Sequence, residues 1–255
     1  MRRVSRAIIE LHAIDKESRQ AGWLQSVHPL CKLLVTIAYL VVLVSFGKFN
    51  LAGTILMGCY LAICFAAGGI SLNMLMRRLW IIILMLAFVG IPNILIDRQP
   101  MMQVGSLVIT GGMISMTTLF LKGIFAIMAA YLLIVTTPME SICGAMRQLH
   151  IPAVLVTVFM LIYRYLIVFL KEVERMTEAY SLRAPNQQGV HFKVWGTMVG
   201  QLLLRSYDRA QTVYESMEMR GFTGEFTLSQ ERTAKLKDYL YGIGWIALFL
   251  TIRFL

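Results

Sequence analysis

Long apolar blocks, separated by short polar stretches, make up most of the chain outside one charged region. A helix that crosses a bilayer needs roughly 20 mostly apolar residues. The blocks cover residues 33–46, 51–70, 79–96, 113–135 and 239–255. The first of them is short, and its flanking residues extend it. This pattern predicts an all-α integral membrane protein with about five transmembrane helices.

Short turn signals separate several of these blocks. The segment Gly47-Lys48-Phe49-Asn50 contains the Gly and Asn that turns favour. The sequence Thr136-Thr137-Pro138 ends the fourth block, because the residue before a proline is pushed out of the helical region. We therefore expect tight boundaries at these two places.

Residues 138–238 differ from the rest, since they hold half of the 24 Lys and Arg residues and most of the 14 Asp and Glu residues. Polar and apolar positions alternate there with the period of a helix. The pattern predicts a short helix at about 139–149 and two long amphipathic helices at about 152–183 and 192–220. Gly221 is typical of the residue that follows a helix end.

Residues 152–170 are apolar enough to form another span. Two arguments favour an amphipathic helix that lies at the membrane surface or beneath the bundle. Arg164 would lie within the bilayer, at a cost of about 2.5–3.5 kcal/mol. A span would also place the following charged region outside the cell, against the preference of Lys and Arg for cytoplasmic segments.

The charge distribution then predicts the topology of a multi-pass cell-membrane protein. Residues 1–32 form a cytoplasmic N-terminal segment, 33–137 carry four spans, 138–238 form a cytoplasmic helical domain, and 239–255 form the last span. The net charge of +10 follows this topology and suits anionic lipid headgroups, so it does not indicate nucleic acid.

Two similar motifs lie in the charged region, at the predicted ends of the long helices. Glu178 and Glu215 each stand five residues before an arginine, and Ala184 and Gly221 follow those arginines directly. One cation in a last helical turn is ordinary, because it complements the helix dipole for about 0.3–1 kcal/mol. Two in matching contexts favour docking, since arginine offers a rigid charged fork that suits carboxylates.

The chain resembles the transmembrane (T) component of energy-coupling factor transporters, in particular the cobalt-type CbiQ branch of the EcfT family. The similar segments run from about residue 14 to the C-terminus. They are Ile14-Asp15, His28-Pro29-Leu30-Cys31-Lys32-Leu33, Thr136-Thr137-Pro138, Gln148-Leu149-His150-Ile151-Pro152, Leu182-Arg183-Ala184 and Met219-Arg220-Gly221. The last two resemble the family's signature pair at the ends of its cytoplasmic coupling helices.

The resemblance implies that residues 138–238 are a coupling-helix domain. Two cytoplasmic ATP-binding-cassette ATPase subunits would bind it and pass their movement to a separate substrate-binding membrane subunit. The expected cargo is cobalt or nickel, and the sequence leaves a vitamin open. The expected ATPase-binding residues are Arg183, Ala184, Arg220, Gly221, Glu178 and Glu215.

We expect no catalytic site, cofactor or metal site in this chain. It lacks the G-x-x-x-x-G-K-[ST] loop of P-loop ATPases, and its four histidines are scattered without ligand spacing. The alternative is a secondary transporter or channel that works without an ATPase. That reading rests on Lys122, an ionisable residue inside the fourth span, where charges often mark transport paths.

Overall fold

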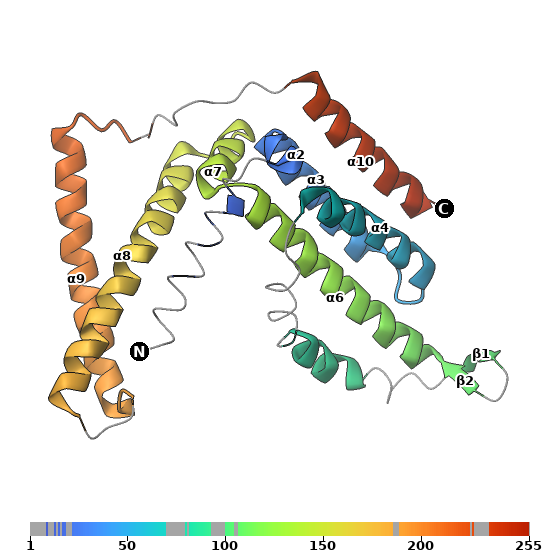
Figure 1. The fold of residues 1–255 in the computed structure, drawn as a ribbon, viewed down its shortest axis with the longest axis horizontal. Coiled ribbons are helices and arrows are strands. Elements are labelled where there is room, and N and C mark those ends of the chain that lie inside the picture. Colours follow the sequence, from blue (N-terminus) through green and yellow to red (C-terminus); the bar gives the residue numbers. More distant parts are fainter. Residues whose placement is uncertain are drawn as a thin grey trace. The chain divides into compact units, whose positions relative to one another are not determined.

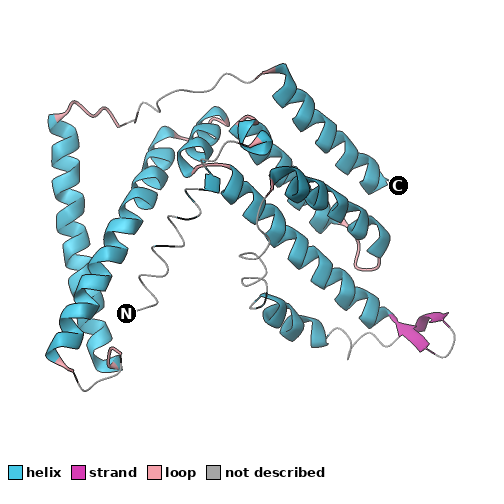
Figure 2. Cartoon of the chain, viewed as in Figure 1, coloured by secondary structure: helices cyan, strands magenta, loops and turns pink. Residues whose placement is uncertain are grey.

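The computed structural model divides into two compact units (Figure 1). The bundle unit comprises residues 18–138 and 232–255, and the hairpin unit comprises residues 1–17 and 139–231. The described residues are 9, 13, 15, 17, 18, 22–69, 80, 82–92, 100–104, 107–185, 189–224, 226 and 235–254. Apart from loops and one short hairpin of strands, this part of the chain is helical (Figure 2).

The bundle unit contains six helices and two strands among its described residues. They are α2 (Trp23–Ser26), α3 (Pro29–Ser45), α4 (Leu51–Gly68), a helix at Ile82–Pro92, β1 (Pro100–Val104), β2 (Leu107–Thr110), α6 (Gly111–Thr136) and α10 (Leu236–Phe254). The hairpin unit contains α7 (Met139–Gln148), α8 (Ala153–Arg183) and α9 (Phe192–Met219). The prediction of an all-α membrane protein is thus confirmed, and the strands are a small addition that the sequence did not suggest.

The boundaries of α3 and α4 follow from local hydrogen bonds. His28 Nδ1 accepts from the Leu30 N–H at 3.3 Å, so the imidazole caps the start of α3. Asn50 Oδ1 accepts from the Gly53 N–H at 3.0 Å and caps α4 in the same way. The Asn50 N–H also donates to the Gly47 carbonyl at 3.3 Å, which confirms the predicted turn.

Two lysines of the bundle unit satisfy carbonyl groups at helix ends. The buried Lys32 Nζ donates to the carbonyl of Thr136, the last residue of α6, at 2.8 Å. Lys122 Nζ donates to the carbonyl of Phe46, which follows α3. The last carbonyls of a helix have no partner within it, and leaving them unpaired in an apolar setting is costly. Each lysine therefore has a structural partner.

Aromatic rings fill the centre of the bundle unit. The Tyr60 ring lies 4.6 Å from Trp245, 5.0 Å from Phe249 and 5.1 Å from Tyr39, measured between centroids. The Tyr39 hydroxyl donates to the Met57 carbonyl at 3.3 Å, so its polar tip is satisfied. These contacts join α3, α4 and α10 into one packed core.

Within the described residues, three helices are long and apolar enough to cross a membrane, judged by length and composition. They are α4, α6 and α8, while α3 and Ile82–Pro92 are shorter apolar helices. The expected span at 79–96 lies partly outside the described residues, and the count of five spans stays a prediction. Because α8 meets the same criterion, its placement at the membrane surface rests on Arg164 and the charge distribution, and it too stays a prediction.

The start of α10 is tied to the start of α3 by one buried carboxylate. Asp238 Oδ1 accepts from the His28 N–H at 3.2 Å, and Oδ2 accepts from the Lys235 N–H at 2.9 Å. Asp238 is only 7% exposed. One side chain thus accepts from two backbone donors, His28 and Lys235, which are 207 positions apart in the sequence.

We expect Asp238→Ala to destabilise the bundle unit by about 1–3 kcal/mol, because it leaves two backbone donors without their acceptor. The measurement is the melting temperature of the purified chain in mild detergent, followed by tryptophan fluorescence. Lys237→Ala, at an exposed neighbouring position, is the matched control. Equal melting temperatures for the two variants would contradict this role of Asp238.

Candidate functional site

The two long helices of the charged region form a helical hairpin within the hairpin unit (Figure 1). α8 has 31 residues and α9 has 28, which correspond to lengths of about 46 and 42 Å. Both predicted amphipathic helices are confirmed to within one or two residues at each end. α7 confirms the shorter predicted helix as well.

The first motif lies at the C-terminal end of α8. Arg183 is the last residue of this helix and is exposed. Ala184 follows as the C-cap, and its N–H donates to the Tyr180 carbonyl at 3.1 Å. The backbone of Ala184 has φ −132°, a value that any residue can adopt. Arg183 therefore extends from a helix end whose backbone is already closed by a local bond.

The second motif lies at the C-terminal end of α9, where the chain makes a Schellman turn. The Phe222 N–H donates to the Met217 carbonyl at 3.0 Å, and the Gly221 N–H donates to the Glu218 carbonyl at 2.9 Å. Gly221 has φ +74°, which suits glycine because it lacks a Cβ. The predicted helix stop at Gly221 is confirmed, and the exposed Arg220 is the C-cap of α9.

The two arginines are far apart. Arg183 and Val194 line the same cavity, and Arg220 stands 26 positions beyond Val194 along α9, or about 39 Å at the helical rise. Among the described residues, no acidic side chain pairs with either arginine. The motif glutamates, Glu178 and Glu215, are both exposed, and Glu215 Oε1 accepts from Gln211 Nε2 at 3.2 Å. Each motif thus presents its arginine to the surroundings at its own end of the hairpin.

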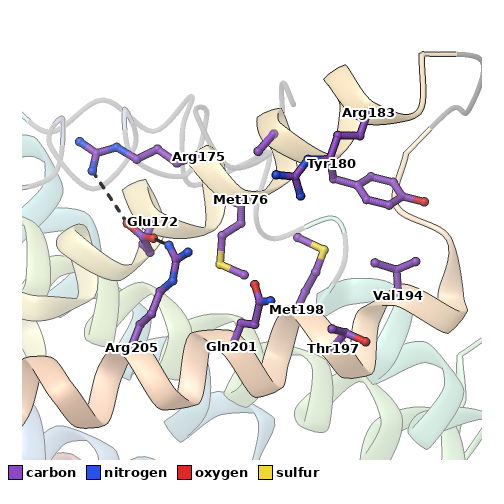
Figure 3. A pocket seen from close by; sticks show the side chains of 11 residues that line it. Glu172, Arg175, Met176, Tyr180, Arg183, Val194, Thr197, Met198, Gln201 and Arg205 are labelled. Carbon is purple, nitrogen blue, oxygen red and sulfur yellow. Dashed lines mark hydrogen bonds and ion pairs between the residues drawn. The ribbon is translucent and has the colours of Figure 1, made fainter.

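A cavity of about 510 Å³ lies between the C-terminal half of α8 and the N-terminal half of α9 (Figure 3). Arg183 lines one end, and Arg175 and Arg205 line the other. Arg205 Nη1 bonds to Glu172 Oε1 across the two helices, and Arg175 lies 3.8 Å from the other oxygen of the same carboxylate. This pair was not predicted from the sequence.

A second cavity, of about 500 Å³, lies between the other halves of α8 and α9. Its lining is mostly apolar, with the aromatic rings of Tyr165, Phe169, Tyr214 and Phe222 among its walls. The hairpin is therefore open along both halves of its length.

Metal-binding chemistry is not apparent in the described part of the chain. No group of three or more His, Cys, Asp or Glu side chains there comes together as a metal site. His28 and His191 cap helices, and His12 lies outside the described residues. Cys143 is buried in α7, and burial, followed by the charge of Glu140, raises the pKa of its thiol. Cys143 therefore behaves as a small apolar side chain.

Lys122, on which the alternative of a secondary transporter or channel rests, has a structural partner. Its ammonium group bonds to the carbonyl at the end of α3, as described above. Nearby, Arg253 Nε donates to Ser45 Oγ at 3.1 Å, also at the end of α3. Both cations thus bond near the C-terminal end of α3, and the bond to the Phe46 carbonyl gives Lys122 a structural role.

Comparison with known proteins identifies the family. A family model described as "Cobalt transport protein", CbiQ, matches residues 20–231. The nickel permease LarQ of Lactiplantibacillus plantarum is 30% identical over 105 residues, which are 41% of this chain and 38% of the permease. A putative fused cobalt transport protein, CbiMQ, of Methanocorpusculum labreanum is 26% identical over 102 residues, which are 40% of this chain and 17% of that protein.

An uncharacterized protein of Methanocaldococcus jannaschii is 28% identical over 132 residues, which are 51% of this chain and 45% of that protein. The matched segments thus span less than half of the length of each of these relatives. The family model, in contrast, covers most of the chain and includes both arginine motifs. The chain is a helical membrane protein that belongs to the CbiQ family of cobalt transport proteins.

Proposed function

We propose that this chain is the transmembrane coupling subunit of an energy-coupling-factor importer. Two cytoplasmic ATP-binding-cassette ATPase subunits bind its hairpin unit. Their ATP-driven movement passes through α8 and α9 to a separate substrate-binding membrane subunit. The chain itself has no catalytic activity. Membership of a cobalt transport family supports this role.

One observation carries the proposal, namely the pair of exposed arginines at opposite ends of the helical hairpin. Arg183 and Arg220 end α8 and α9, and local backbone bonds already close both helix ends. Their guanidinium groups are therefore not needed as caps. A guanidinium makes its strongest contacts with a carboxylate, through two parallel hydrogen bonds. Each arginine thus suits an acidic groove on a partner.

The similarity of the two motifs supports two similar partners. Glu178 and Glu215 stand at the same distance from their arginines, and Ala184 and Gly221 are small residues at matching positions. A separation of about 39 Å between the arginines is compatible with one motif for each of two subunits. In this arrangement each glutamate contacts the rim of the groove that receives the arginine of its own motif, and the small residue after that arginine leaves room for the walls of the groove.

The cargo is proposed to be cobalt or nickel. Two of the relatives named above carry nickel and cobalt, respectively, in their descriptions, and the description of the family model carries cobalt. In this proposal the separate membrane subunit captures the ion, and the chain supplies movement. Cargo selection would then reside in that subunit.

We expect the double change Arg183→Glu with Arg220→Glu to abolish ATPase association, because each glutamate would repel the carboxylates that received the arginine. Each single change should weaken association at least tenfold. The measurement is a pull-down of the tagged chain from its native membrane in mild detergent, with mass spectrometry of the proteins that accompany it.

Lys171→Glu with Arg209→Glu is the matched control, since it reverses two exposed charges on the same helices outside the motifs. The control should retain its partners. Full association of the Arg183→Glu, Arg220→Glu variant would overturn the docking role. A wild-type chain that emerges without any ATPase would overturn the coupling function as a whole.

The size of the residue after Arg183 gives a second test. We expect Ala184→Leu to weaken ATPase association at least tenfold while Ala184→Ser leaves it near the wild-type level, because only the larger side chain obstructs the groove. The backbone at Ala184 accepts any residue, so the comparison isolates side-chain volume. The measurement is the same pull-down, quantified against a dilution series. Equal association of the two variants would show that the groove does not approach this position.

A further inference from the structure

An ion pair between Glu172 and Arg205 joins α8 to α9. Glu172 lies midway along the polar half of α8, and its side chain is 23% exposed. Arg175 approaches the same carboxylate from one turn further along α8, at 3.8 Å, but its side chain is 78% exposed. The carboxylate thus faces one guanidinium from each helix, and of these two contacts the one to Arg205 links α8 to α9.

Cavities flank this contact on both sides along the hairpin. The cavity of about 510 Å³ extends from Glu172 and Arg205 toward the loop that follows Arg183. The cavity of about 500 Å³ begins beyond the pair, with Phe169 and Ser206 among its lining residues. Helices that pack closely have side chains interdigitated over their contact. Here the ion pair lies where two cavities meet, and the space on either side gives the helices room to turn.

We propose that Glu172 and Arg205 are positioning residues that form a pivot between α8 and α9. The bond between them sets the angle of the two helices and, through it, the separation of Arg183 and Arg220. The functional consequence rests on the coupling role proposed above, whereas the control of the angle does not.

The lengths of the helices on either side of the pair make the pivot effective. Arg220 stands 15 residues beyond Arg205, or about 22 Å at the helical rise, and Arg183 stands 11 residues beyond Glu172, or about 16 Å. A rotation of about 10° at the pair would therefore move Arg220 by about 4 Å relative to α8. A displacement of that size is enough to change which groups a guanidinium can reach.

The strength of the contact suits a pivot. A partly exposed ion pair contributes little to overall stability, and salt screens it. It can therefore be disrupted and re-formed without unfolding the helices. In a complex, the grooves that hold the two arginines would set the distance between Arg183 and Arg220. The Glu172–Arg205 ion pair would stay formed where that distance matches its geometry and would break where it does not.

The test measures the distance between the two ends directly, in the full-length chain and without any partner. Leu182 and Met219 stand next to the two arginines and are 82% and 91% exposed. Both are changed to Cys and spin-labelled, in a chain that carries Cys59→Ser because Cys59 is the exposed native cysteine among the four. Pulsed electron paramagnetic resonance in lipid nanodiscs then reports the distribution of distances.

We expect a single narrow distribution for the labelled parent. Glu172→Gln and Arg205→Gln should each broaden it about twofold, because either change removes the charge pair, and Glu172→Gln does so without changing the size of the side chain. The exchange Glu172→Arg with Arg205→Glu should restore the narrow distribution. Raising NaCl from about 0.05 to 1 M should broaden the parent and leave Glu172→Gln unchanged.

Asp208→Asn is the matched control, since it removes an exposed acidic charge close to Arg205 in sequence without touching the pair. It should leave the distribution narrow. The pivot is overturned if Glu172→Gln keeps the parent's distribution, or if the charge exchange stays as broad as the single variants.

A second measurement separates the pivot from the coupling function. In unlabelled Glu172→Gln both arginines remain, so ATPase subunits should still co-purify, while cobalt uptake per ATP hydrolysed in proteoliposomes should fall several-fold. Unchanged uptake in an assembled Glu172→Gln complex would overturn the pivot's role in coupling. A wild-type chain that binds no ATPase would overturn the proposed function, and the distance measurement would still decide the pivot.

Discussion

The need to satisfy polar groups at helix ends in apolar surroundings governs the bundle unit. Within a lipid bilayer every backbone N–H and C=O must find a partner in the protein, which a helix provides everywhere except at its ends. Lys32, Lys122 and Asp238 each meet this need at a helix end. Charged residues that would otherwise suggest an ion path are thereby explained as part of the architecture.

In the hairpin unit, backbone groups rather than side chains close the C-terminal ends of the two long helices. This difference supports the proposed docking role of the two arginines. Ala184 bonds back to Tyr180, and Gly221 and Phe222 complete the turn after α9. With the backbone closed in this way, Arg183 and Arg220 add only a favourable interaction with the helix dipole, worth about 0.3–1 kcal/mol. A lysine of the bundle is held by its helix end, whereas these arginines are available to a partner.

Sequence reasoning predicted the features that depend on local patterns. The helices at 139–149, 152–183 and 192–220, the turn at 47–50 and the stop at Gly221 all follow from periodicity or from the conformational preferences of single residues. The first apolar block was given as residues 33–46 with extension by its flanking residues, and the structure shows that this extension begins at Pro29. Lys32 looked like a polar flank, and only the fold shows that it reaches the end of α6.

Contacts between distant segments could not be predicted in the same way. Glu172 and Arg205 lie on helices that carry many charged residues, and their pairing depends on the register of one helix against the other. The short hairpin of β1 and β2 depends likewise on pairing between strands. The placement of α8 at the membrane surface or beneath the bundle is a prediction that rests on Arg164 and on the distribution of charge.

The two units differ in how firmly their helices are packed, and this difference bears on how movement could be transmitted. In the bundle unit, aromatic rings of α3, α4 and α10 meet at 4.6–5.3 Å between centroids. Close packing of that kind resists deformation, because a small displacement loses many contacts at once. Between α8 and α9, two cavities of about 500 Å³ each replace such contacts. A force applied at Arg183 and Arg220 would therefore change the angle of the hairpin before it deformed either helix.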